Sequence, residues 1–272
     1  MKEIGGQALI EGVLMLSPEK IAIALRKNKK IITKVEKRNQ STKILKKIPF
    51  LRGLVALIEM LYIGTKALLY STEVSAGEDE EITKTELSLT LLLSIIIGVG
   101  LFIALPLYLT KLFTSERIAF NILDGIFRII IFITYIFVIG FSKEIKRVYQ
   151  YHGAEHMAVH CHESKKALTV NNVKQFPPEH PRCGTAFLLI VLMVSILLFS
   201  LVWHESWLIK FIQRIVLIPV VASISYEILK VSAKFKFLKF LTYPGLWLQK
   251  LTTRQPSKDQ IEVAITAIKK VL

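Results

Sequence analysis

Long apolar stretches dominate the chain after residue 86. Four of them are long enough to cross a bilayer, because a helix needs about 20 residues to span the hydrocarbon core. They cover residues 87–109, 118–141, 185–203 and 208–229. We therefore expect a mostly α-helical membrane protein with four transmembrane helices.

A different pattern fills the N-terminal part of the chain. Residues 20–27 and 30–37 alternate apolar and polar side chains, and Asn28 and Lys29 stand between them. This pattern predicts a β-hairpin with a tight turn, within a small N-terminal β-containing unit. The segment 5–16 has glycines at both ends of an apolar run. Such a segment is typical of a strand of the same sheet or of a backbone that approaches another group closely.

The segment 50–70 is apolar except for one polar face. Arg52, Glu59 and Lys66 are spaced seven residues apart, so they share one side of a helix. If this helix spanned the membrane, the hairpin and the polar stretch 71–86 would lie on opposite sides of it. We favour a helix that lies in the inner membrane interface or against the bundle, followed by a loop at 71–86.

The C-terminal part of the chain is amphipathic. Residues 234–256 mix lysines with aromatic side chains, which is typical of the headgroup level of the inner leaflet. Ser257 followed by Gln260 forms a capping-box pattern that predicts the start of a helix. The apolar stripe of this helix indicates packing against the cytoplasmic unit rather than recognition of a partner. Its apolar stripe comprises Ile261, Ile265, Ile268 and Leu272.

Composition and charge support a membrane protein. Mean hydropathy is +0.48, 52% of the residues are hydrophobic, and the formal net charge is +15. Lysine and arginine are concentrated before residue 87, in 142–184 and after residue 229, so the positive-inside rule assigns both termini and 142–184 to the cytoplasm. Nucleic-acid binding is not favoured, because the charges flank apolar runs and no recognisable nucleic-acid motif accompanies them. We expect a multi-pass protein of the cell membrane that contacts membrane lipid.

These patterns divide the chain into parts with different environments. Both cysteines fall on the cytoplasmic side, where a metal or structural role is favoured over a disulfide. The parts are a cytoplasmic β-hairpin unit (1–49), an interfacial helix with an acidic loop (50–86), transmembrane helices 1 and 2 (87–141), a cytoplasmic segment rich in histidine and cysteine (142–184), transmembrane helices 3 and 4 (185–229), and a cytoplasmic interfacial segment with an amphipathic helix (230–272).

Histidines are concentrated in the segment 142–184. His152, His156 and His160 are spaced four residues apart, so on a helix they form one stripe. Residues 152 to 156 also match the H-x-x-E-H motif of zinc peptidases, in which two histidines bind metal and the glutamate, here Glu155, is the general base. A single interfacial histidine more often hydrogen-bonds a headgroup. Five histidines and two cysteines in one segment nevertheless favour a metal site.

The candidate metal ligands combine imidazole and thiolate, which favours zinc or another divalent transition metal. They are His152, His156, His180 and Cys183, with Glu227 as a third ligand or as a carboxylate behind one. Four bound protein ligands would make a closed structural site, whereas three would leave a position open for catalysis. Glu227 is equally well interpreted as a carboxylate that reaches the membrane surface from the fourth apolar stretch.

Charged residues also fall inside the apolar stretches, at Asp124, Arg128 and Arg214. Charges within a membrane face the bundle interior or a wet cavity. Asp124 and Arg128 are four residues apart and are expected to pair. We interpret the group as an ionic contact that holds the helices together, with a substrate path as the alternative.

Motifs spread over nearly the whole chain resemble those of one family. The motifs are "GGQALIEGVLM" near the N-terminus, "YHGAEH" at 151–156, "HPRCGT" at 180–185, and "PGLWLQKLTTRQP" with "QIEVAI" within 244–265. The chain is similar to the YqhQ-like family of bacterial membrane proteins, which carry a domain of unknown function and are often labelled metal-dependent enzymes. The resemblance implies a multi-spanning membrane protein and supplies no reaction. The metal site it implies comprises His152, Glu155, His156, His180 and Cys183.

Two functions remain open from the sequence. The first is a metal-dependent hydrolase with Glu155 as base, acting on a peptide or lipid-linked substrate at the inner leaflet. Glu11 would then add a second carboxylate, unless its segment is simply a strand at the edge of the sheet. The second is a non-catalytic membrane scaffold or assembly factor, in which a structural zinc site stabilises the fold and the protein binds a membrane-proximal partner. Metal transport is disfavoured, because the apolar stretches lack a ladder of polar residues.

Overall fold

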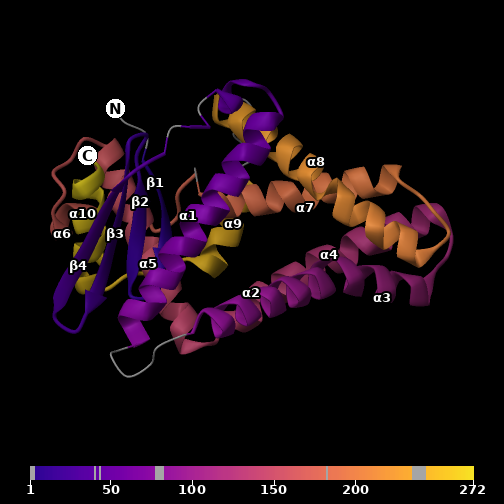
Figure 1. Ribbon diagram of the computed structural model, residues 1–272, viewed down its shortest axis with the longest axis horizontal. Helices are drawn as coiled ribbons and strands as arrows, with labels where there is room; N and C mark the ends of the chain where they lie inside the picture. Colours follow the sequence, from indigo (N-terminus) through magenta and orange to yellow (C-terminus); the bar gives the residue numbers. More distant parts are fainter. Residues whose placement is uncertain (1–3, 40, 43, 77–82, 182, 235–242) are drawn as a thin grey trace.

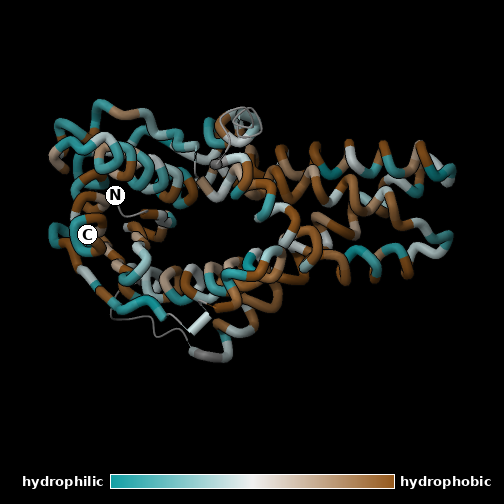
Figure 2. Tube along the Cα trace, turned by 90° about the horizontal axis from the view of Figure 1, so that it is seen from above, coloured by the Kyte–Doolittle hydropathy of each residue, from teal (hydrophilic) through white to brown (hydrophobic). Residues whose placement is uncertain are grey.

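The protein consists of a sheet-based unit and an arm of long helices (Figure 1). The computed structural model describes residues 4–39, 41–42, 44–76, 83–181, 183–234 and 243–272. Hydrophilic residues gather at the end that holds the sheet, and hydrophobic residues dominate the helical arm (Figure 2). This separation is compatible with a multi-pass membrane protein.

The sheet is an antiparallel meander with the strand order β1-β2-β3-β4. Its strands are β1 (Gly5–Leu9), β2 (Gly12–Leu16), β3 (Lys20–Lys27) and β4 (Lys30–Lys37). The predicted hairpin is confirmed, since Lys27 pairs with Lys30 across a turn in which Asn28 has φ 56°, a conformation that asparagine tolerates. The segment 5–16 belongs to the same sheet, as two strands.

Different helices cover the two faces of the sheet, and the central strands β2 and β3 are the most buried. The helices are α1 (Leu51–Ala76) on one face, and α5 (Lys143–Glu163) with α10 (Lys258–Val271) on the other. Successive side chains of a strand point to opposite faces. In β2, Val13 and Met15 pack with α5 and α10, whereas Leu14 and Leu16 pack with α1. The sheet is therefore the middle layer of the unit.

The C-terminal helix α10 forms as its sequence predicts. Ser257 and Gln260 make the reciprocal capping box, with hydrogen bonds of 2.9 and 3.3 Å. Ile261 and Ile268 are fully buried against the sheet and α5, so the predicted packing is confirmed. Leu272 lies past the end of the helix and is 43% exposed, because the buried stripe ends one residue earlier.

Among the residues that the structure describes, five helical segments are long and apolar enough to cross a membrane: 51–75, 85–113, 117–139, 184–201 and 207–232. The last four correspond to the four predicted stretches. The helices in them are α2 (Lys84–Val99) with α3 (Leu105–Phe113), then α4 (Arg117–Ile139), α7 (Gly184–Leu201) and α8 (Trp207–Lys234). The fifth candidate is α1, so length and composition alone do not confirm the predicted number of four.

Helix α1 runs across the direction of α4 and α7 (Figure 1). Its buried Ala67 packs on the sheet. Its predicted polar face forms ion pairs with residues in and just after β4. Glu59 pairs with Arg38 at 2.9 Å, and Lys66 pairs with Glu36 at 2.8 Å. The same helix also contacts α8, so it joins the sheet-based unit to the helical arm.

Two boundaries differ from the predictions. The stretch predicted at 118–141 ends slightly earlier as a helix, since α4 stops at Ile139 and a separate helix, α5, begins at Lys143. Ser142 caps α5 by accepting a hydrogen bond from the backbone N–H of Ile145, and serine is a preferred residue at this position. Helix α1 extends into the predicted loop 71–86, of which residues 77–82 lie outside the described residues. Residues 235–242 of the predicted interfacial segment also lie outside them.

Replacing Ile268 by alanine tests the packing of α10 on the sheet. Ile268→Ala removes a fully buried side chain and is expected to lower the free energy of unfolding by about 2–5 kcal/mol. Leu272→Ala, on the same helix face in the sequence pattern, is the matched control with an expected effect within about 0.5 kcal/mol. Urea titration of the purified protein in detergent measures both variants. Equal losses in the two variants would contradict the packing described here.

Candidate metal centre

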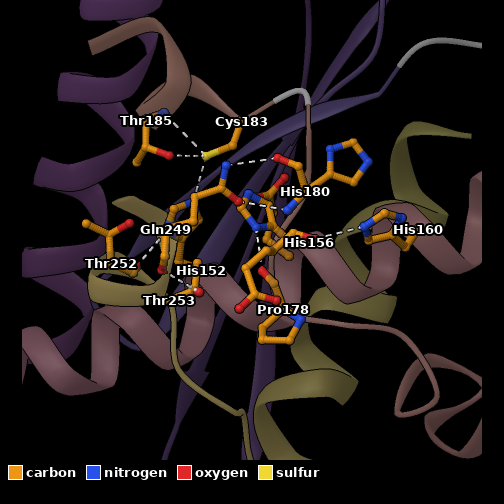
Figure 3. Close-up of polar contacts among 12 residues, drawn as sticks. His152, His156, His160, Pro178, His180, Cys183, Thr185, Gln249, Thr252 and Thr253 are labelled. Carbon is orange, nitrogen blue, oxygen red and sulfur yellow. Dashed lines mark hydrogen bonds and ion pairs between the residues drawn. The ribbon is translucent and has the colours of Figure 1, made fainter. Parts of the chain in front are cut away.

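The histidine stripe of α5 meets the chain segment that precedes α7 (Figure 3). The rings of His152 and His156 lie 4.3 Å apart between centroids, as expected for successive helical turns. From the other segment, Cys183 brings its Sγ to 3.2 Å from Nε2 of His152. The ring of His180 lies beside that of His160, with 4.3 Å between centroids and a tilt of 58° between the planes. The structure thus gathers four histidines and one cysteine from two parts of the chain.

Backbone carbonyls fix the orientation of the first two rings. Nδ1 of His152 lies 2.9 Å from the carbonyl oxygen of Thr252, and Nδ1 of His156 lies 2.6 Å from that of Pro178. A carbonyl oxygen can only accept a hydrogen bond, so each Nδ1 must carry the proton and donate. In a neutral ring held this way the lone pair is on Nε2, which is the arrangement found in metal-binding histidines.

His152, His156 and Cys183 form the first candidate ligand group. One ligand atom from each lies within 4.8 Å of the other two. Burial lowers the pKa of His156 well below its usual value, so the ring is neutral. Burial also raises the pKa of the Cys183 thiol, and the backbone N–H and hydroxyl of Thr185, which hydrogen-bond Sγ at 3.4 and 3.2 Å, oppose that rise. Two imidazoles and one sulfur suit a zinc-type cation.

A second group lies beside the first and comprises His160, Glu163 and His180. His160 donates from Nε2 to the carbonyl of Glu179 at 2.9 Å, and Nε2 of His180 lies 3.3 Å from a carboxylate oxygen of Glu163. The ring centroids of His156 and His180 are 5.7 Å apart, which links the two groups. His180 therefore belongs to the second group, whereas the predicted ligands His152, His156 and Cys183 form the first group.

Glu155 faces the first group from inside the protein. Its side chain is buried, and one carboxylate oxygen lies 3.5 Å from Nε2 of His156. Burial raises the pKa of the Glu155 carboxyl to about 8, and the neighbouring His152 opposes that rise. A Cβ atom on Gly6 would lie only 2.7 Å from Cγ and Oε1 of Glu155. The glycine-flanked segment 5–16 thus makes the close approach that its sequence indicated.

Gly153, inside the H-x-x-E-H motif, leaves space on the surface of α5 for the backbone of Arg254. A Cβ atom on Gly153 would lie 2.2 Å from the carbonyl oxygen of Arg254. The N–H of Arg254 in turn donates to the carbonyl of Tyr149 at 3.0 Å. This contact holds the segment after α9 (Tyr243–Thr252) against α5, where the carbonyl of Thr252 reaches His152.

Gln249 and Thr252 are residues of the site that the sequence analysis missed. Gln249, on α9, is fully buried; its Oε1 accepts from the N–H of His180 at 2.7 Å and its Nε2 donates to the carbonyl of His180 at 3.0 Å. This pair of hydrogen bonds fixes the backbone of His180. The composition of 234–256 indicated only an interfacial segment. The motif within 244–265 was the signal that could have identified both residues.

Two other candidate carboxylates lie elsewhere. Glu227 accepts hydrogen bonds from Arg52, with Oε1 at 2.7 Å from Nε, at the contact between α1 and α8. Glu11, in the turn between β1 and β2, pairs with Arg147 and accepts from the hydroxyl of Tyr151 at 3.4 Å. Neither carboxylate belongs to the two ligand groups that the described residues form.

Comparison with known proteins covers nearly the whole chain. Residues 48–272 match the family described as "Protein of unknown function (DUF1385)". A protein of Bacillus subtilis (strain 168), "Uncharacterized protein YqhQ", is 37% identical over 291 residues, which cover 98% of this chain and 92% of the relative. No solved structure matches. The chain therefore belongs to the DUF1385 family of proteins of unknown function.

Proposed function

We propose that the protein is a metal-dependent hydrolase of the cell membrane, with a zinc-type cation held by His152, His156 and Cys183. One observation carries the proposal. Both histidines of the H-x-x-E-H motif donate Nδ1–H to a backbone carbonyl, and the two rings and the Cys183 sulfur each place one ligand atom within 4.8 Å of the others. A solvent-facing or headgroup-binding histidine requires no such pair of bonds.

The membrane arrangement proposed here has four crossing segments, formed by α2 with α3, α4, α7 and α8. Helix α1 lies in the inner interface, which is supported by its direction across the other helices and by its ion pairs with the sheet-based unit. The concentration of lysine and arginine around the sheet-based unit supports a cytoplasmic location for both termini and for the metal centre.

The chemistry of the site follows from its residues. A bound divalent cation supplies an electrophile that polarises a carbonyl or phosphoryl oxygen and makes water more acidic. Glu155 is positioned to accept a proton from the attacking water and to return it to the leaving group, because its carboxylate lies beside Nε2 of His156. The rings of His152 and His156 act as ligands. With three protein ligands, one position stays available for water or substrate.

The proposed substrate is a peptide or a lipid-linked compound at the inner leaflet. Helix α9 supports this location, because it carries the site residue Gln249 while Tyr243 and Trp247 are largely exposed. Tyrosine and tryptophan are enriched at the boundary between membrane and water. The site would therefore lie within reach of the headgroup region.

A non-catalytic scaffold is the second candidate, and one observation favours it. His180 lies 5.7 Å from His156 between ring centroids, close enough to complete a four-ligand site after a small movement of its ring. Because Cys183 is the N-cap of α7, a closed site of this kind would attach α5 to α7 and stabilise the fold. The number of protein ligands distinguishes the two functions.

Replacing Cys183 tests the ligand assignment. Cobalt-substituted protein is expected to show a sulfur-to-cobalt charge-transfer absorption band, because Cys183 would contribute a thiolate. Cys183→Ser should lose this band. Cys161→Ser is the matched control, since the Cys161 sulfur hydrogen-bonds the carbonyls of Lys166 and Ala167, outside both ligand groups. A band that survives in Cys183→Ser would remove Cys183 from the site.

Replacing Gly153 tests the contact that orients His152. In Gly153→Ala the new methyl group meets the carbonyl of Arg254, so the segment carrying Thr252 must move. Zinc affinity is expected to fall about 10–100-fold, as when a ring loses its outer hydrogen-bond partner. Gly98→Ala is the control, because nothing lies within 4 Å of a Cβ atom there. Competition with a metal-sensitive dye measures both, and an unchanged affinity in Gly153→Ala would contradict the role of this contact.

Replacing Glu155 separates the hydrolase from the scaffold. Glu155→Gln keeps the shape of the side chain but cannot accept a proton, so hydrolysis should fall at least about 100-fold with unchanged zinc content. The assay is mass spectrometry of a membrane extract incubated with the purified protein, in search of products that wild-type protein makes. Glu262→Gln, on the exposed side of α10, is the control. Identical product profiles for wild type and Glu155→Gln would eliminate the hydrolase and leave the scaffold.

A further inference from the structure

A group of buried charges lies in the helical arm, on α4 and α8, which carry none of the candidate metal ligands of the two groups. Asp124 on α4 accepts from Nε of Arg128 at 2.9 Å and from Nη1 of Arg214 on α8 at 2.8 Å. The expected pairing of Asp124 with Arg128 is therefore present, with Arg214 as a third member. All three side chains are at most 5% exposed. One carboxylate is thus shared by two guanidinium groups.

Lys210 adds a further buried cation to this region. Its side chain is 9% exposed, and its ammonium group lies 3.9 Å from the ring centroid of Phe120 and 3.7 Å from that of Trp203. Within the described part of the chain this ammonium group has neither a hydrogen bond nor an ion pair. An ammonium group has three donors to satisfy, and ring faces satisfy them only in part.

The region therefore has an excess of positive charge. Lys210, Arg128 and Arg214 are buried with a single carboxylate, that of Asp124. Nη2 of Arg128 is buried and has no hydrogen-bond partner among the residues described. Buried charge without a counter-charge is costly in a low-dielectric environment. The positive-inside rule does not explain Lys210 either, because it follows the α7–α8 connection, which lies at the end of the arm away from the sheet (Figure 1).

A cavity of about 470 Å³ opens beside Lys210. It lies between the α3–α4 and α7–α8 connections, and its volume is within the usual range for small-molecule sites of about 300–1,000 Å³. Its walls carry three cations against one carboxylate, together with a serine and three aromatic rings. The lining residues are Lys111, Ser115, Arg117, Phe120, Trp203, Glu205, Trp207 and Lys210.

We propose that this cavity binds the phosphate group of an anionic amphiphile from the membrane leaflet farther from the sheet. The cations Lys111, Arg117 and Lys210 would receive the phosphate oxygens, since charge-assisted hydrogen bonds to phosphate are among the strongest available to a protein. The aromatic walls suit the apolar part of the ligand. The phosphate would supply the counter-charge that Lys210 lacks.

The test uses the full-length protein in a neutral detergent and two soluble probes with identical tails. Dihexanoyl phosphatidic acid carries the phosphate, and dihexanoylglycerol lacks it. Two of the three tryptophans line the cavity, so intrinsic fluorescence reports occupancy. Phosphatidic acid is expected to give a saturable change, and dihexanoylglycerol to give none. Equal binding of both probes, or no binding of phosphatidic acid, would overturn the proposal.

Variants locate the site. Lys210→Met should weaken binding of phosphatidic acid about tenfold or more, and Arg117→Gln, an exposed change at the rim that leaves the buried charges intact, about threefold. Lys269→Met, an exposed lysine on α10, is the matched control and should bind as wild type does. Wild-type affinity in both Lys210→Met and Arg117→Gln would overturn the assignment.

Competition with inorganic phosphate distinguishes a lipid headgroup from free phosphate as the ligand of the cavity. If the site is built for a lipid headgroup, inorganic phosphate should compete with phosphatidic acid only at concentrations at least about 100-fold higher. Inorganic phosphate that binds as tightly as phosphatidic acid would show a site for the free anion and would overturn the amphiphile as ligand.

Discussion

The hydrogen bonds from histidine rings to backbone carbonyls are the constraint on which the candidate metal centre depends. The carbonyls of Pro178 and Thr252 come from segments that are distant in the chain, and each fixes one ring of α5. A buried carbonyl that loses its hydrogen-bond donor lowers the stability of the fold by about 1–3 kcal/mol. Each histidine ring and the carbonyl that it contacts therefore stabilise each other's position. The site can form only when α5, the segment before α7 and the segment after α9 are all in position.

Two glycines make this assembly possible on different sides of α5. Gly6 leaves space for the side chain of Glu155, and Gly153 leaves space for the carbonyl of Arg254. Residues two positions apart on a helix point about 200° away from each other, so positions 153 and 155 face different neighbours. The helix is held between the sheet and the segment after α9. This explains why the glycine-flanked strand β1 and the C-terminal motif, at opposite ends of the chain, serve the same histidine stripe.

The parts of the fold that follow from local patterns could be predicted from the sequence. The hairpin followed from the alternation of apolar and polar residues, and the capping box at Ser257 marked the start of α10. The common face of His152 and His156 followed from their spacing. The role of Gln249 could not be predicted, because it depends on how α9 packs beside the segment before α7, and composition carries no information about that contact. The separation of His180 from Cys183 likewise depends on tertiary packing, since both lie in one short motif.

Within the helical arm, an irregular stretch of backbone contacts the buried charges. Pro106 has no N–H, so the carbonyl of Phe102, four residues earlier, loses its helical partner in the π-helical turn between α2 and α3. Nη1 of Arg128 donates to that carbonyl at 3.2 Å while Nε of Arg128 pairs with Asp124. The arginine therefore satisfies a backbone group that no water could reach in a membrane. Replacing Arg128 by an apolar residue would remove this donor from the carbonyl of Phe102. The missing N–H of Pro106 thus leaves a backbone acceptor for Arg128. This contact accounts for the presence of Arg128 at a position where membrane insertion alone would disfavour a charge.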